Sequence, residues 1–476
     1  MDDVLKYSKV LNYFKEISKI PRESGNEAGI SNYLVNMAKT EGWQVFQDES
    51  YNVLIKKPAS EGYENAPVVL LQGHMDMVCE KSPGVVHDFQ KDPIKLNIVD
   101  DFIYADGTTL GADNGIGMAM CLAVLKDDEL EHPPLEVLFT TGEEKGMKGV
   151  QALDGNKFKS SILINLDSEG EGVFTAGCAG ALRIALHLPL RKEKIYDKQS
   201  YRIIVCGLKG GHSGDDIDKG RGNANKILGR LLLDIKDYIS LCSIKGGTKE
   251  NVIPSEAEAA IASKNEDILK EKIDKWNEIL KKEFLFSDPD AVIKLEKCCN
   301  INEAFNEDTK CKIIKAINML PNGVNTKNHK INLVISSSNM AVIDTETDRA
   351  VIRFSIRSSI KSNIYDDLAE RIRMIADILG FEYEEGSSYP GWEYSQNSYI
   401  RELCMKAYEE VTGEKAYAEA IHAGLECGYL MEKISNLDAV SFGPQLYDIH
   451  TPNEHVVISS IEKTYNLLCE VLKKIR

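Results

Sequence analysis

The stretch LLQGHMDMVCE, residues 70–80, decides how the chain is interpreted. It continues the apolar run PVVLL at 67–71, whose β-branched residues are typical of a buried strand. After the break at Gly73, His74 and Asp76 follow one residue apart, and residues i and i+2 of an extended chain point to the same side. A strand that ends in this way brings an imidazole and a carboxylate to one place, which raises the question of what they serve.

Further strands and helices are expected on both sides of this stretch. Short buried strands are predicted at 135–140 (LEVLFT) and 161–166 (SILINL). A helix is predicted to follow Gly111, with Asp113 or Asn114 as its cap. Strands that alternate with helices are typical of an α/β layer built on a largely buried sheet.

The length of 476 residues exceeds what one ordinary hydrophobic core serves, so two domains are expected. Between Arg183 and Glu385, strand-like runs alternate with charged amphipathic helices, and two stretches read as βαββαβ. Beyond this region the α/β pattern returns. We therefore predict an α/β catalytic domain in two pieces, 1–184 and 386–476, with an α+β domain inserted at 185–385 that could contain two similar halves.

The composition favours a cytoplasmic protein. A net charge of −17 argues against nucleic acid or an anionic membrane as a partner. The sequence has no run of about 18 apolar residues, the length that is needed to span a membrane. The N-terminal MDDVLKYSKV has acidic residues where a signal peptide requires basic ones. Eleven cysteines without CxxC spacing favour reduced thiols over a zinc–cysteine site.

Several carboxylates share with His74 a position just after an apolar strand, or in the loop that follows one. In open α/β sheets, ligands bind beyond the carboxyl ends of the strands. Carboxylates gathered there cannot all stay ionised without a cation. Two histidines and four or more carboxylates without a thiol are a ligand set for zinc, manganese or cobalt, and two ions sharing a bridging carboxylate would neutralise the cluster. The candidates are His74, Asp76, Asp113, Glu143, Glu144, Asp167 and His450, with His455 as an alternative to His450.

Each candidate alone has an ordinary structural interpretation. A histidine after a strand is usually a satisfied surface or core residue, Asp113 could be a helix cap, and Glu143–Glu144 could be a solvated turn. Their joint order along the chain favours a metal site: H-x-D, then D, then EE, then D, then a C-terminal H.

With these motifs the chain resembles the M20 family of metallopeptidases, in particular its aminoacyl-histidine dipeptidase (Xaa-His dipeptidase, peptidase D) branch. The resemblance covers essentially the whole chain. It is carried by IPRESGNE (20–27), GHMDMV (73–78), LGADNGIG (110–117), TTGEEKGMKG (140–149), NLDSEGEG (165–172), GGHSGDDI (210–217), HAGLECG (422–428) and IHTPNEHV (449–456).

The resemblance implies a role for each metal-site candidate. It implies one metal ion on His74 and Asp167, a second on Glu144 and His450, and Asp113 as the bridge between them. The resemblance thus explains why His74 and Asp76 point to the same side: it implies that His74 is a metal ligand and that Asp76 accepts its other ring N–H.

Glu143 is implied to be the general base, because a carboxylate that binds no metal can accept a proton from the activated water. Asp167 favours dipeptide cleavage, since the family tends to have Glu at this position in carboxypeptidases and deacylases.

The inserted domain would be the family's lid. The resemblance implies that His212, on the Gly-flanked loop GGHSG, stabilises the tetrahedral oxyanion. It also implies that Asn251, Arg357 and Gly424 hold the C-terminal carboxylate of the substrate, which a guanidinium can bind with two hydrogen bonds. Arg353 lies four residues earlier in the same predicted strand and is an alternative to Arg357.

The implied function is hydrolysis of small peptides, with aminoacyl-histidine (carnosine-like) dipeptides as substrates. Two divalent ions are implied as cofactors, zinc first and cobalt or manganese as alternatives. Other functions within the family are a tripeptidase and an N-acyl amino acid deacylase or carboxypeptidase. A catalytically silent metal- or peptide-binding protein is disfavoured because the base and all five ligand positions are filled. A lid longer than that of dimeric relatives could still form a homodimer, or mimic a partner within one chain.

Overall fold

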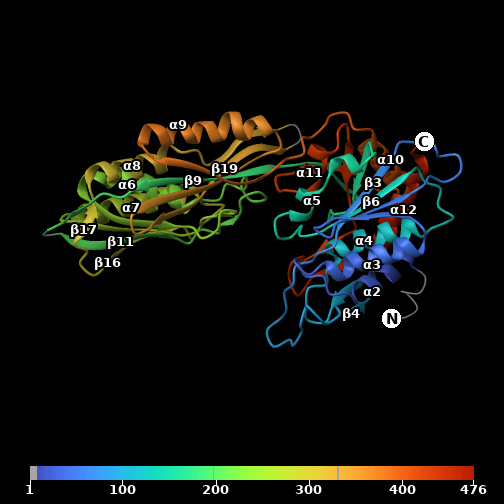
Figure 1. Ribbon diagram of the computed structural model, residues 1–476. Coiled ribbons are helices and arrows are strands. Elements are labelled where there is room, and N and C mark those ends of the chain that lie inside the picture. Colours follow the sequence, from blue (N-terminus) through green and yellow to red (C-terminus); the bar gives the residue numbers. More distant parts are fainter. Residues whose placement is uncertain (1–7, 197, 330–331) are drawn as a thin grey trace. The chain divides into compact units, whose positions relative to one another are not determined.

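The computed structural model describes residues 8–196, 198–329 and 332–476, which form two compact units (Figure 1). Unit 1 comprises the residues up to Gly177 with Trp392–Ala420 and Leu425–Arg476, and unit 2 comprises Cys178–Gly391 and Ile421–Gly424. The divisions fall at 177/178 and 391/392, whereas 184/185 and 385/386 were predicted, and the short segment Ile421–Gly424 was not expected to join the inserted unit. Residues 1–7, which contribute to the signal-peptide argument, lie outside the described residues.

An eight-stranded mixed sheet forms the centre of unit 1. Its four middle strands, β6, β3, β7 and β23, are parallel, and antiparallel strands flank them on both sides. The parallel strands are buried along most of their length, as their nearly continuous apolar sequences predict. In sheet order the strands are β1 (Gln44–Gln47), β2 (Val53–Lys57), β6 (Leu135–Thr140), β3 (Val69–His74), β7 (Ile162–Asn165), β23 (Asp438–Ser441), β8 (Val173–Cys178) and β22 (Tyr417–Ile421).

Helices and a small second sheet complete unit 1. The core-forming helices are α2 (Lys9–Ile17), α3 (Ala28–Thr40), α4 (Ala112–Leu125), α10 (Tyr399–Thr412) and α12 (Ile458–Lys474). The shorter helices are α5 (Lys148–Ala152) and α11 (Glu426–Lys433). The second sheet has the order β24 (Leu446–Tyr447), β25 (His455–Val457), β5 (Phe102–Ala105) and β4 (Leu96–Val99).

Helix α4 is apolar on every side and is buried in the core of unit 1. Its start differs from the prediction that Asp113 or Asn114 caps it: Gly111 is the N-cap residue, with φ of 67°, and has no side chain to cap the helix. The Asn114 side chain is engaged elsewhere, because it donates to the Leu166 carbonyl and accepts from the His74 N–H. Asp113 and Asn114 both lie inside the helix, so neither is its N-cap.

Unit 2 contains one long sheet with the order β16-β11-β15-β13-β19-β20-β9-β21, and β18 (Gly323–Asn328) pairs with β19 beside it. The first four strands and their helices follow the chain as βαββαβ: β11 (Gln199–Cys206), α6 (Ala224–Ile235), β13 (Ser240–Gly246), β15 (Ala257–Ser263), α7 (Glu266–Glu283) and β16 (Val292–Lys297). The other four have the same internal order, with the first group inserted after their first strand: β9 (Gly180–Pro189), α8 (Glu307–Met319), β19 (Leu333–Thr345), β20 (Arg349–Ser358), α9 (Glu370–Leu379) and β21 (Glu382–Tyr389).

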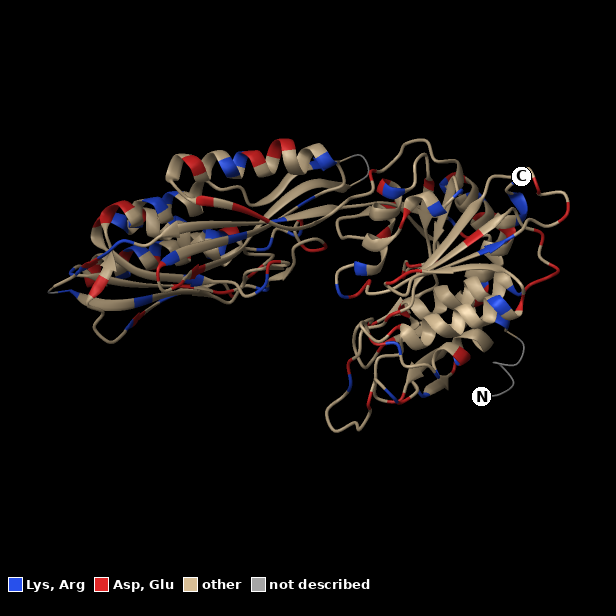
Figure 2. Cartoon of the chain, viewed as in Figure 1, with Lys and Arg blue, Asp and Glu red and all other residues tan. Residues whose placement is uncertain are grey.

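Two details of unit 2 bear on the prediction. One of the strand-like runs of this region, 252–262, is divided in the structure: Pro254 separates β14 (Val252–Ile253) from β15, because proline cannot donate to a strand ladder. Acidic and basic residues are interspersed along the helices of this unit (Figure 2), and some form ion pairs along one helix, such as Lys270 with Glu266.

Among the described residues, none of the helices combines the length and apolarity needed to cross a membrane, and no disulfide is formed.

Candidate metal centre

Three segments of the predicted site follow neighbouring parallel strands. β3 lies between β6 and β7 and pairs with both in parallel. His74 is the last residue of β3, Glu143 and Glu144 follow β6, and Asp167 follows β7. Because the carboxyl ends of parallel strands meet at one edge of a sheet, the topology itself gathers these side chains.

Asp113 and His450 join this edge from the start of α4 and from the loop between β24 and β25. His74 Nε2 lies 3.0 Å from Asp113 Oδ1, and His450 Nε2 lies 3.2 Å from Asp113 Oδ2. The two carboxylate oxygens of Asp113 therefore face different histidines, which is the arrangement that a bridging ligand requires.

Asp167 and Glu144 complete the two groups. Asp167 Oδ1 lies 3.4 Å from His74 Nε2, and Glu144 Oε1 lies 2.9 Å from His450 Nε2. In His74–Asp113–Asp167, and again in Asp113–Glu144–His450, one ligand atom of each residue lies within 4.8 Å of the others. The structure thus brings all five predicted ligand residues together. Their role as metal ligands stays a prediction.

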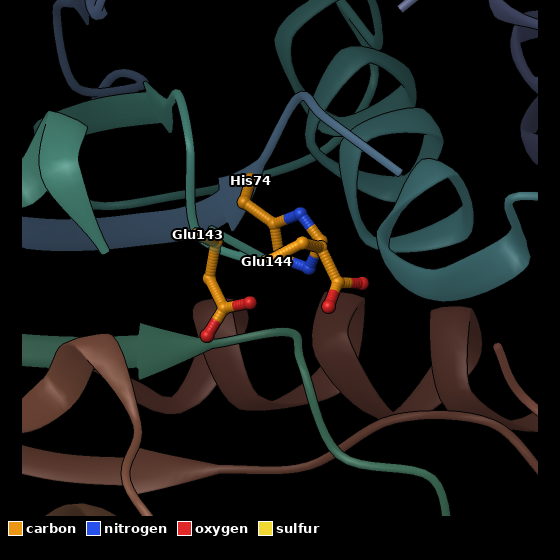
Figure 3. Close-up of side chains that lie close together, drawn as sticks. All are labelled: His74, Glu143 and Glu144. Carbon is orange, nitrogen blue, oxygen red and sulfur yellow. The ribbon is translucent and has the colours of Figure 1, made fainter. Parts of the chain in front are cut away.

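Glu143 lies beside these groups and is needed by neither. With His74 and Glu144 it forms a third close group (Figure 3). Burial raises the pKa of Glu143 well above its usual value; the charge of His74 lowers it, and those of Asp167, Glu426 and Glu144 raise it further. A carboxylate in such surroundings is suited to accept and return a proton.

The electrostatics of the site fit positive ions. Hydrogen bonds with Asp113 and Glu144 raise the pKa of His450 to about 10. Burial raises the pKa of Asp167 to about 6, with help from Asp113 and Glu144 and against the attraction of His74. At this site the carboxylates therefore outnumber the two histidines that could balance their negative charge. Two imidazoles and three carboxylates without a thiolate are a donor set for zinc, cobalt or manganese, so the residues present fit two divalent ions.

The Asp76 carboxylate has a role beyond the one expected of it. His74 Nδ1 lies 3.1 Å from the Asp76 backbone carbonyl and 3.5 Å from its carboxylate, so the carbonyl is the nearer acceptor. The carboxylate accepts hydrogen bonds from the N–H groups of Glu143 and Glu144, at 3.0 and 3.2 Å, and from the Ser24 hydroxyl at 2.7 Å. Although burial opposes it, His74, Ser24 and the Glu143 N–H lower the pKa of Asp76 to about 2. Asp76 thus fixes the turn that carries both glutamates.

A buried carboxyl group beside the site, Glu426, was not among the predicted residues. It begins α11 and accepts hydrogen bonds from Gln72 Nε2 and Thr140 Oγ1, both at 2.6 Å. Burial raises its pKa to about 8. In the sequence, Glu426 is the one acidic residue of the HAGLECG motif, from which only Gly424 was predicted as a site residue.

In unit 2, Arg357 lies close to Tyr389, which also packs against Gly424, and to His212. Arg357 is buried, and its Nη1 donates to the Tyr389 hydroxyl at 2.7 Å. Arg357 Nη2 lies 3.5 Å from His212 Nε2, and His212 Nδ1 lies 2.8 Å from a carboxylate oxygen of Asp215. A Cβ atom at Gly424 would lie 2.7 Å from the Tyr389 ring, so glycine is required for this close approach.

Asn251, the fourth predicted substrate-handling residue, is exposed. Its carbonyl accepts a hydrogen bond from the Ser213 N–H at 2.9 Å, which places it beside the short β12–β14 ladder, where His212 of β12 (Gly211–His212) pairs with Val252. A side-chain role for Asn251 stays a prediction.

Comparisons with known proteins show similarity over most or all of the chain. The profile described as Peptidase family M20/M25/M40 matches residues 70–474. The cytosol non-specific dipeptidase of Escherichia coli (strain K12) is 39% identical over 468 residues, which are 97% of this chain and 96% of that protein. The crystal structure of aminoacylhistidine dipeptidase from Vibrio alginolyticus is 37% identical, with a TM-score of 0.94 over 100% of this chain and 98% of that one. A tripeptidase from Staphylococcus aureus, 18% identical, has a TM-score of 0.60 over 98% of both chains and shares the fold.

Proposed function

The chain belongs to peptidase family M20/M25/M40, and we propose that it is a two-metal dipeptidase with Glu143 as its general base. The observation that carries this proposal is the pair of His–carboxylate groups that share Asp113 at one sheet edge. The two similar proteins from Escherichia coli and Vibrio alginolyticus, both named dipeptidases, match nearly the full length of the chain and support this activity.

His74, Asp113 and Asp167 would hold one metal ion, and Asp113, Glu144 and His450 the other. When bound, such ions would polarise the peptide carbonyl and lower the pKa of the attacking water. Zinc suits the mixed nitrogen and oxygen donors, and cobalt or manganese would suit them too.

The chain's own residues then handle the proton. Glu143 takes a proton from the attacking water and passes it to the leaving amine nitrogen. Asp76 holds the Glu143 N–H at 3.0 Å and so fixes where the Glu143 carboxylate can reach. Oxyanion stabilisation by His212 stays a prediction; its Nδ1 lies 2.8 Å from Asp215 and its Nε2 lies 3.5 Å from Arg357 Nη2, so Nε2 faces the arginine proposed to bind the substrate.

Arg357 is suited to the C-terminal carboxylate of the substrate because it is a buried cation that helps His212 lower the pKa of the Asp215 carboxyl without forming an ion pair with it. Only 5% of the residue is exposed, its Nε has no hydrogen-bond partner, and no carboxylate pairs with it among the described residues. Burying an unpaired charge is costly unless a ligand supplies the opposite charge. Arg353 is already paired with Glu346, at 3.4 Å, and its side chain is 32% exposed. These differences favour Arg357 as the carboxylate-binding arginine.

We expect Arg357→Ala to lower kcat/KM for a free dipeptide by about 10–100-fold, the equivalent of a charge-assisted hydrogen bond of about 1.5–3 kcal/mol. The same dipeptide amidated at its C-terminus, a poor substrate of the wild type, should lose little further activity. Arg353→Ala is the matched control and should leave both rates near wild type. An equal loss on both substrates would make Arg357 structural, and a selective loss in Arg353→Ala would mean that the other arginine binds the carboxylate.

Dipeptides with histidine second are the proposed preferred substrates, and the cytoplasm is the proposed location. The Vibrio alginolyticus protein is named for aminoacylhistidine substrates, whereas the Escherichia coli protein is named a non-specific enzyme of the cytosol. Steady-state rates with Ala-His, Ala-Ala, a tripeptide and an N-acetylated amino acid separate the alternatives. Hydrolysis of Ala-His faster than the other three supports the proposal, and a preference for the tripeptide or the N-acetylated substrate contradicts it.

A further inference from the structure

Glu454 is a buried carboxylate bound to the backbone that carries Asp113. Only 2% of the residue is exposed. Its Oε2 accepts hydrogen bonds from the N–H groups of Leu110 and Gly111, at 2.7 and 2.9 Å. Its Oε1 accepts from the N–H groups of Ala112 and Asp113, at 2.8 and 3.3 Å. Four consecutive N–H groups thus surround one carboxylate, and both of its oxygens are occupied.

These N–H groups need a partner because the backbone here is not helical. Gly111 has φ of 67°, and Asp113 has φ of −80° with ψ of 111°. The first N–H groups of a helix have no partner within the helix in any case. A buried N–H without a hydrogen bond is costly, so Glu454 decides whether this conformation of the Asp113 segment is stable.

Arg22 binds the same segment through a backbone carbonyl and is also 2% exposed. Its Nη1 donates to the carbonyls of Met75 and Asp76, at 3.0 and 3.2 Å, and its Nη2 donates to the Gly111 carbonyl. Arg22 therefore joins the segment that follows His74 to the segment that precedes Asp113.

Together the two residues connect three ligand-bearing segments. Glu454 lies four residues after His450, in the loop that ends at β25, and binds the Asp113 segment, which Arg22 joins to the His74 segment. We propose that Glu454 and Arg22 are positioning residues that hold the two oxygens of Asp113 in place for two metal ions. This inference rests on the proposed metal centre. It adds that metal affinity depends on two charged residues that touch no metal.

The test is zinc affinity of the metal-stripped protein, measured by competition with a chromophoric chelator. E454Q keeps the shape of the side chain, but one oxygen becomes an NH₂ group that cannot accept from the N–H donors it faces. Loss of such outer support typically weakens metal binding by about 10–100-fold, and we expect that loss at one or both sites.

Glu136 provides a matched control in unit 1. It is 2% exposed, and it accepts hydrogen bonds from the N–H groups of Lys159 and Ser160 and from Lys56, at the opposite end of β6 from the site. We expect both E136Q and E454Q to lower the thermal stability of the metal-free protein. E136Q should nevertheless leave zinc affinity at the wild-type value.

The outcomes separate this inference from the proposed function. A wild type that binds no zinc would remove the metal centre itself. Wild-type zinc affinity in folded E454Q, or an equal loss in E136Q, would overturn the positioning role alone. Where E454Q fails to fold, Arg22→Lys decides. It keeps the charge but not the fork that reaches three carbonyls, and it too should bind zinc about 10–100-fold more weakly.

Discussion

Replacing Glu143 with alanine is expected to abolish nearly all dipeptide hydrolysis while leaving two metal ions bound. Loss of general acid–base catalysis alone lowers kcat by about 10²–10⁴-fold, and loss of water positioning adds to it. Metal binding should survive because neither His74–Asp113–Asp167 nor Asp113–Glu144–His450 includes Glu143. The measurement pairs kcat for Ala-His with the metal content of the same preparation.

Glu144→Ala is the neighbouring control for this experiment. It should lose metal as well as activity, because Glu144 Oε1 lies 2.9 Å from His450 in one of the two groups. Retention of more than about a tenth of wild-type kcat in Glu143→Ala, against the expected loss of 10²-fold or more, would show that another group takes the proton.

The second large effect is expected for Asp113→Ala, which should lose both metal ions and all activity. Asp113 belongs to both proposed metal-binding groups, whereas His74 belongs to only one of them. The negative charge of Asp113 would also screen the repulsion between the two ions. His74→Ala is the matched comparison and should retain more metal. Metal analysis after identical purification measures the difference. Equal metal content in the two variants would contradict the bridging role of Asp113.

The metal-site candidates were predictable because parallel strands order their carboxyl ends at one edge. His74 ends one strand, and Glu143 and Asp167 follow two others; short apolar runs in the sequence indicated all three strands, so sequence order translated directly into proximity. Asp113 and His450 come from a helix start and a loop. Only their residue types in order, and the family resemblance, pointed to them.

The supporting residues could not be predicted in the same way. Glu454 and Arg22 bind backbone groups, and a backbone N–H or carbonyl leaves no mark on the sequence. The partners of Glu454 also lie more than three hundred residues away, which only the folded chain can bring near. For the same reason the Asp76 carboxylate was assigned to His74, although its shorter hydrogen bonds go to Ser24 and to the turn N–H groups.

In unit 2 the strand pattern predicted elements but not their pairing. The two βαββαβ groups are not consecutive, because β9 begins one group before the other is inserted, and alternating strands and helices cannot reveal which strands become neighbours.

Whether this protein is a two-metal dipeptidase is decided by titrating the metal-stripped chain with zinc while following Ala-His hydrolysis and bound zinc together. We expect negligible hydrolysis without metal, and a rate that reaches its maximum only when two zinc ions are bound per chain. Hydrolysis at the full rate by the metal-free chain would contradict the proposal. So would a rate that reaches its maximum with one zinc ion bound per chain and does not change when the second ion binds.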